Sequence, residues 1–208
     1  MGPDTERQIM NTNTEAKKTQ RISTRDLVLT GMFTAIICVL SQVSINIQPI
    51  PFTLGLFSIF LTGTLLSPRY ALLSVMAYLL LGAFGLPVFA GFKGGVHALV
   101  GMTGGYLMAY PLVAFLTALS CKLARKYKPH GKKLLFNEKL FVPFVMFLSM
   151  TVFLSLCYLI GTAWFTFITG KTFYVALTLC VFPYILFDLF KIVLAISLSF
   201  LIRRATAK

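Results

Sequence analysis

Two oppositely charged residues, Asp188 and Lys191, stand inside the last long apolar run of the sequence, residues 177–202. In a membrane, each such charge costs roughly 2.5–3.5 kcal/mol on insertion scales, so a buried pair needs a reason. A spacing of three places both side chains on one face of a helix, where they can pair. We therefore predict a polar binding site near the middle of this span. A purely structural ion pair between helices is the alternative.

The composition places these charges in a membrane protein. Of the 208 residues, 57% are apolar and only 12% are charged, and the mean hydropathy is +0.83. Soluble domains carry about 25% charged residues, and this chain has too few polar residues to cover a soluble globule. The four cysteines lie far apart within apolar runs, without the short spacings of a zinc site or a disulfide framework. We predict an all-α integral membrane protein.

Six apolar runs are candidate spans, because about 20 residues are needed to cross the hydrocarbon core. They cover residues 27–47, 52–66, 70–84, 106–123, 140–160 and 177–202. The second and third are short, but Ser67 before Pro68 is typical of a new helix start, so we keep them separate.

The basic residues predict how these spans cross the membrane. With six spans, 16 of the 19 Lys and Arg residues fall on one side. The positive-inside rule then places both termini in the cytoplasm of a multi-pass protein of the cell (plasma) membrane. Residues 1–26 form a cytoplasmic arm, part of which can come from an expression tag, 27–202 the six-helix membrane domain, and 203–208 a cytoplasmic tail. Because the basic residues flank apolar runs, we assign them to the lipid bilayer and not to nucleic acid.

Glycine concentrates between the third and fourth predicted helices. Eight of the fifteen glycines lie between Gly82 and Gly105, and the connection over residues 85–103 is long and apolar. Irregular backbone at membrane depth is tolerated only where protein or a water-filled cavity surrounds it. We predict a glycine-rich loop folded over the outer mouth of the bundle.

Two further stretches, residues 41–48 and 103–105, are candidates for the polar part of the site. Polar and apolar residues alternate over residues 41–48, which predicts an extended segment that turns Asn46 and Gln48 inward; an ordinary polar loop is the alternative. Thr103, Gly104 and Gly105 open the fourth helix, whose free N–H groups suit a carboxylate. Thr103 can equally be a simple helix cap.

Four sequence blocks, taken together, resemble one family. They are Pro51-Phe52-Thr53, the run from Gly82 to Gly91 (GAFGLPVFAG), the run from Gly101 to Leu107 (GMTGGYL), and Asp188 with Lys191. Over about residues 27–202 the chain resembles BioY, the biotin-binding S component of energy-coupling factor (ECF) vitamin transporters. Met102 departs from the family pattern, which usually has proline at this position.

The resemblance implies a six-helix protein that captures biotin with high affinity from the outer face. It implies partners: an EcfT-like coupling membrane subunit and two cytoplasmic ATPase subunits. Gly31 and Ala35 form a small-residue pair on the first helix, which in the family is taken to dock the coupling subunit. No ATP-binding motif, catalytic triad or metal motif is present, so we expect no enzyme activity, no metal and no cofactor.

The chemistry of biotin suggests how the site is arranged. The ureido ring can donate to Asp188 and accept from Lys191, while the fused rings pack against Phe52, Phe89 and Tyr106. Glycines such as Gly91 permit close backbone approach. The carboxylate then lies near Thr103, Gly104 and Gly105 or near Lys93; the reverse pose, with Lys191 on the carboxylate, stays open.

Two alternative functions remain: an S component for another vitamin, and a proton-coupled secondary transporter that uses Asp188 and Lys191. Tyr158 and Trp164 are interpreted as membrane-interface aromatics, or as residues that stack on a ligand.

Overall fold

The computed structural model describes residues 23–45, 50–127 and 138–206, and these residues are almost entirely helical. The helices are α2 (Thr24–Gln42), α3 (Gly55–Leu65), α4 (Pro68–Ala83), α5 (Val96–Val100), α6 (Gly104–Lys126), α7 (Glu138–Thr169), α8 (Phe173–Cys180) and α9 (Ile185–Thr206). Two short strands, β1 (Ser44–Ile45) and β2 (Phe52–Thr53), pair antiparallel. The predicted all-α class is confirmed.

Helix α3 forms the centre of the bundle and contacts α2, α4, α6 and α9. Nine of its eleven residues are buried, including the hydroxyl residues Ser58, Thr62 and Thr64. Each hydroxyl donates to a backbone carbonyl three or four residues earlier, so no polar group is left unsatisfied by this burial. At Gly63 an added Cβ would lie only 2.7 Å from Thr117 Cβ, so this glycine allows α3 to pack tightly on α6.

Four helices in the described part of the chain are long and apolar enough to cross a membrane: α2, α6, α7 and α9. Helices α3 and α4 are apolar but shorter. Large apolar side chains stay exposed along α7, at Leu140, Phe144, Leu148 and Val152. Their spacing of four keeps them on one helix face, as expected of a surface that faces lipid.

The predicted continuous span 177–202 is wrong. Helix α8 ends at Cys180, a turn follows, and α9 begins at Ile185. Pro183 lies in this turn, where its missing N–H and its ring disfavour continuation of the helix. Asp188 consequently lies in the first turn of α9 and not at mid-span. The fifth predicted span, 140–160, is longer than expected, since α7 continues to Thr169.

Other local predictions are confirmed. Helix α4 begins at Pro68, which occupies a position in its first turn, so the two short apolar runs are separate helices. Of the extended segment predicted over residues 41–48, Ser44 and Ile45 are extended, as β1 pairs with β2 in the register Ser44↔Thr53, while Ser41 and Gln42 still belong to α2. Asn46 and Gln48 lie outside the described residues.

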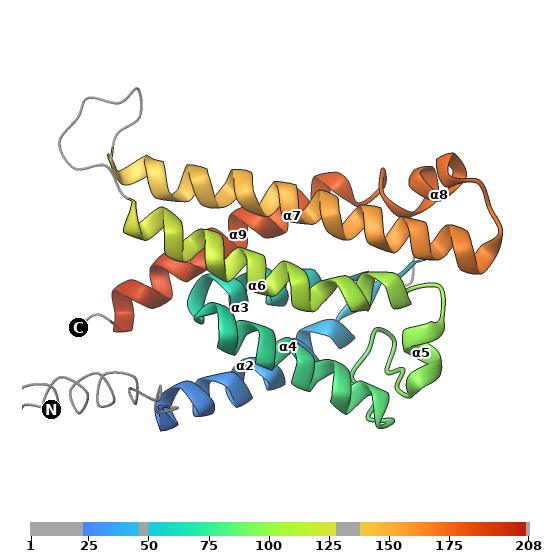
Figure 1. The fold of residues 1–208 in the computed structure, drawn as a ribbon, viewed down its shortest axis with the longest axis horizontal. Coiled ribbons are helices and arrows are strands. Elements are labelled where there is room, and N and C mark those ends of the chain that lie inside the picture. Colours follow the sequence, from blue (N-terminus) through green and yellow to red (C-terminus); the bar gives the residue numbers. More distant parts are fainter. Residues whose placement is uncertain (1–22, 46–49, 128–137, 207–208) are drawn as a thin grey trace, which may run out of the picture.

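The two ends of the bundle differ. Figure 1 shows α5, α8 and the paired strands toward one end, and the start of α2 and the C-terminal ends of α6 and α9 at the other. The short helices α5 and α8 and the paired strands therefore lie toward one end, which is where a cavity lies.

Candidate functional site

A cavity of about 400 Å³ opens among β2, the segment between α4 and α6, and helices α6, α7 and α9. This volume lies within the range of small-molecule sites, roughly 300–1,000 Å³. Seven predicted site residues line it: Phe52, Phe89, Lys93, Thr103, Tyr106, Asp188 and Lys191. Residues separated by more than 100 positions in the sequence thus meet around one cavity.

Asp188 and Lys191 form a buried ion pair on this cavity. Lys191 Nζ donates to Asp188 Oδ1 at 2.7 Å, and the two residues are 4% and 5% exposed, respectively. The same ammonium donates to the Thr53 carbonyl at 2.7 Å and lies 3.8 Å from the centre of the Phe52 ring. A buried charge is stable only when it is paired and hydrogen-bonded, and Lys191 meets both conditions.

The second oxygen of the carboxylate also has a partner. Tyr158 Oη, on α7, donates to Asp188 Oδ2 at 2.6 Å. Because Tyr158 and Lys191 donate to opposite oxygens of the Asp188 carboxylate, its orientation is fixed. Asp188, Lys191 and Tyr158 all border the cavity. The three side chains form a preorganised polar wall, able to accept from an N–H group and to donate to a carbonyl or carboxylate.

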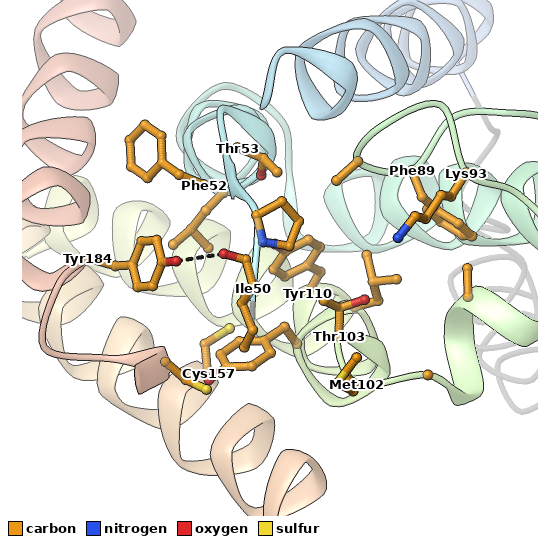
Figure 2. A pocket seen from close by; sticks show the side chains of 18 of the residues that line it. Ile50, Phe52, Thr53, Phe89, Lys93, Met102, Thr103, Tyr110, Cys157 and Tyr184 are labelled. Carbon is orange, nitrogen blue, oxygen red and sulfur yellow. Dashed lines mark hydrogen bonds between the residues drawn. The ribbon is translucent and has the colours of Figure 1, made fainter. Parts of the chain in front are cut away.

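Tyr184 attaches the segment before α3 to the turn before α9. Its hydroxyl donates to the Ile50 carbonyl at 2.6 Å, as the dashed line in Figure 2 marks, and its ring stacks on Phe52 with the centroids 6.2 Å apart. Together with the Lys191–Thr53 hydrogen bond, this contact fixes β2 against α9. One wall of the cavity therefore depends on side chains from the far end of the sequence.

The opposite wall comes from the glycine-rich segment. Figure 2 shows Phe89, Lys93 and Thr103 across the cavity from Tyr184. Phe89 and Lys93 form an isolated bridge, with the Phe89 N–H donating to the Lys93 carbonyl at 2.9 Å. Gly91, with φ +70°, lies in the turn between them and does not line the cavity, so its positive φ explains the glycine.

Gly104 and Gly105 also lie off the cavity. They begin α6 as predicted, but an added Cβ at Gly105 would collide with Trp164 Cβ, and one at Gly104 with the Leu99 carbonyl. Trp164 Nε1 donates to the Gly101 carbonyl at 2.9 Å, so this tryptophan packs against the start of α6. Thr103 occupies the N-cap position without a side-chain capping bond, which leaves its role on the cavity open.

Sequence reasoning missed part of the lining, including Tyr158 as a partner of Asp188, and Tyr110, Tyr184, Cys157, Cys180 and His97. These residues follow no local motif; only the fold brings them to the cavity. Within the described ranges, His, Cys, Asp and Glu side chains do not gather in groups of three, and a protein metal site usually needs at least three.

Gly82 supports the position of Phe89. A Cβ at residue 82 would overlap the Phe89 ring, which packs edge-on against Tyr78 at 5.5 Å between centroids. We expect Gly82→Ala to displace this ring and to lower the free energy of unfolding by about 1–3 kcal/mol, as overpacking usually does. Gly31→Ala is the matched control, because this helical glycine has open space around it and alanine favours a helix. Thermal unfolding of both variants tests this expectation. Equal melting temperatures of Gly82→Ala and Gly31→Ala would contradict it.

Together the fold and the cavity define a helical membrane protein with a cavity large enough for a small molecule at one end of its bundle. The family model for the BioY family matches residues 11–208. The chain belongs to the BioY family.

Curated relatives and a solved structure agree with this assignment. The chain is 34% identical to the probable biotin transporter BioY of Pyrococcus horikoshii, over 84% of this chain and 94% of the relative. It is 52% identical to the biotin transporter BioY of Thermotoga maritima, over 46% of this chain and 56% of the relative. The fold is similar to a crystal structure of the S component for biotin from an ECF-type ABC transporter. The TM-score is 0.72 at 25% identity, covering 86% of this chain and 91% of the other.

Proposed function

We propose that this protein is the high-affinity biotin-binding and uptake subunit, the S component, of an ECF-type ATP-driven transporter. The observation that carries the proposal is the cavity of about 400 Å³ with a buried Asp188–Lys191 pair on its wall. Biotin transporters of the BioY family, and the S component for biotin with the similar fold, support the substrate. The protein binds and releases its substrate unchanged.

The wall chemistry suits the bicyclic end of biotin. A ureido group offers two N–H donors and one carbonyl, which match the Asp188 carboxylate and the Lys191 ammonium. Phe52, Phe89 and Tyr106 supply apolar surface for the fused rings. The carboxylate tail then extends toward Thr103 and Lys93, on the opposite wall. In the reverse pose Lys191 binds the carboxylate, and Gly104 and Gly105 take no direct part in either pose, because neither lines the cavity.

The proposal includes a membrane topology. Helices α2, α3, α4, α6, α7 and α9 cross the bilayer as six spans, in a membrane domain of residues 27–202. Arg125, Arg203 and Arg204 near the C-terminal ends of α6 and α9 put that end in the cytoplasm, by the positive-inside rule. Both termini are then cytoplasmic, as the arm 1–26 and the tail 203–208, and the glycine-rich loop covers the outer mouth.

Energy for uptake comes from partner subunits. An EcfT-like membrane subunit and two cytoplasmic ATPases are the expected partners of an S component. Gly31 and Ala35 are both exposed on α2, four residues apart on one helix face, and Gly31 has open space around it. Small residues let another helix approach closely, so this face is the proposed docking surface for the coupling subunit.

Transport by reconstituted vesicles tests the proposed function. We expect uptake of radiolabelled biotin to require the coupling subunit, both ATPases and ATP, and to survive a protonophore. Unlabelled biotin should compete, while riboflavin and thiamine should not. Competition by riboflavin or thiamine would contradict the assignment of biotin as the substrate. Uptake that collapses with the proton gradient and persists without the ATPases would instead indicate a secondary transporter driven by proton transfer at Asp188.

A further inference from the structure

Two arginines meet at the end of the molecule away from the cavity. Arg125 Nη2, near the end of α6, donates to the Thr64 carbonyl at 3.2 Å. Arg203 Nη2, near the end of α9, donates to the same oxygen at 2.7 Å and to the Leu65 carbonyl at 3.3 Å. The last carbonyls of a helix lack partners within it and form its negative dipole end. The two guanidinium groups therefore cap the central helix α3.

Capping alone offsets only part of this positive charge. A helix end carries about half an elementary charge, against two full positive charges here. Among the side chains that the structure describes, which do not include that of Glu138, neither arginine forms an ion pair, and the acidic ones are Asp26 and Asp188, the latter in the cavity. Arg203 Nε is buried without a hydrogen-bond partner. Each guanidinium has five N–H donors, so several remain for an anion.

The depth of the pair in a membrane identifies the kind of anion. A helix rises about 1.5 Å per residue and the hydrocarbon core is about 30 Å thick, so Arg125 lies roughly one core thickness along α6 from Gly104. Since Gly104 is at the cavity end, Arg125 lies at the level of the opposite headgroups. Lys122, Lys126 and Arg204 are exposed at the same end and add positive potential. Phosphate groups of lipids occupy this level.

We propose that Arg125 and Arg203 bind the phosphate of an anionic phospholipid headgroup between the ends of α6 and α9. A guanidinium fork matches two phosphate oxygens, which makes arginine better suited to this geometry than lysine. Basic pockets between membrane helices on the cytoplasmic side are known to favour anionic lipids. The site lies at the far end of the bundle from the cavity, so it does not depend on which vitamin binds there.

Lipid-dependent thermal stability in nonionic detergent tests this site. A ligand at about ten times its Kd raises the melting temperature of a chain of this size by about 3–6 °C. We expect phosphatidylglycerol to produce such a shift, and phosphatidylcholine and sodium phosphate to produce less than half of it. The double variant Arg125→Gln/Arg203→Gln should lose most of the shift. The matched control Lys122→Gln/Lys126→Gln, which removes two exposed charges from the same helix end, should keep it.

A second variant separates binding from folding. Arg203→Lys keeps the charge and removes the fork, so it should fold, bind biotin with wild-type affinity and still show a reduced phosphatidylglycerol shift. Equal shifts in the wild type and both arginine variants would overturn the proposal, as would an equal shift from sodium phosphate alone. If the arginine variants keep the lipid shift but lose the coupling subunit on purification, the anion is a protein carboxylate and the lipid proposal is wrong. Biotin binding is measured in parallel on the same proteins. Loss of biotin binding by the wild type would contradict the proposed function without bearing on the lipid site.

Discussion

Lys191→Met is expected to weaken biotin binding at least about tenfold and to lower the free energy of unfolding by roughly 3–5 kcal/mol. Methionine has a similar length without the charge, so Asp188 would remain buried with only Tyr158 as partner. The Thr53 carbonyl would lose its donor at the same time. A hydrogen bond from a charged donor contributes about 1.5–3 kcal/mol, and each 1.4 kcal/mol is a factor of ten in affinity.

The matched control is Lys171→Met, since Lys171 is exposed between α7 and α8 at the cavity end of the molecule but does not line the cavity. It should leave both the biotin affinity and the melting temperature unchanged. Equilibrium binding of radiolabelled biotin and thermal unfolding measure the two effects. Wild-type affinity in folded Lys191→Met protein would show that the pair has only a structural role.

The double variant Asp188→Asn/Lys191→Met is expected to separate stability from binding. Replacing both members of a buried ion pair is often neutral or stabilising, because no uncompensated charge remains. The asparagine oxygen can still accept from Tyr158. We therefore expect its melting temperature to return close to that of the wild type, while biotin binding stays at least about tenfold weaker, since the charged partners of the ureido group are gone.

This combination distinguishes a binding pair from a structural one. A purely structural pair predicts that affinity recovers together with stability in the double variant. A binding pair predicts recovery of stability alone. Thermal unfolding and biotin binding on the same protein samples give both readouts. Recovery of both would contradict the role proposed for Asp188 and Lys191.

The sequence was most informative where a residue type is costly in a membrane. A charged pair in an apolar run demands compensation, so the position of the site on the last helix could be predicted from Asp188 and Lys191. Pro68 and the alternation near the end of α2 likewise report local backbone rules, and the structure confirms the helix start and the extended backbone at Ser44 and Ile45. These predictions needed no knowledge of tertiary contacts.

The features that the sequence did not predict depend on tertiary packing. The break between α8 and α9 was not predicted, because Pro183 is compatible with a kink as well as with an end to the helix, and neighbouring contacts choose between them. Tyr158 lies 30 residues before Asp188, and no sequence spacing reports their hydrogen bond. Gly104 and Gly105 were assigned to the ligand because the free N–H groups of a helix start suit a carboxylate, but their close neighbours are Leu99 and Trp164.

Calorimetric titration of the purified protein in detergent, with biotin and then with riboflavin and thiamine, tests the central claim most directly. A single preorganised cavity predicts one biotin per chain, bound tightly, and no heat of binding from the other two vitamins. Absence of biotin binding by folded protein, or equally tight binding of riboflavin or thiamine, would contradict the assignment of this cavity to biotin.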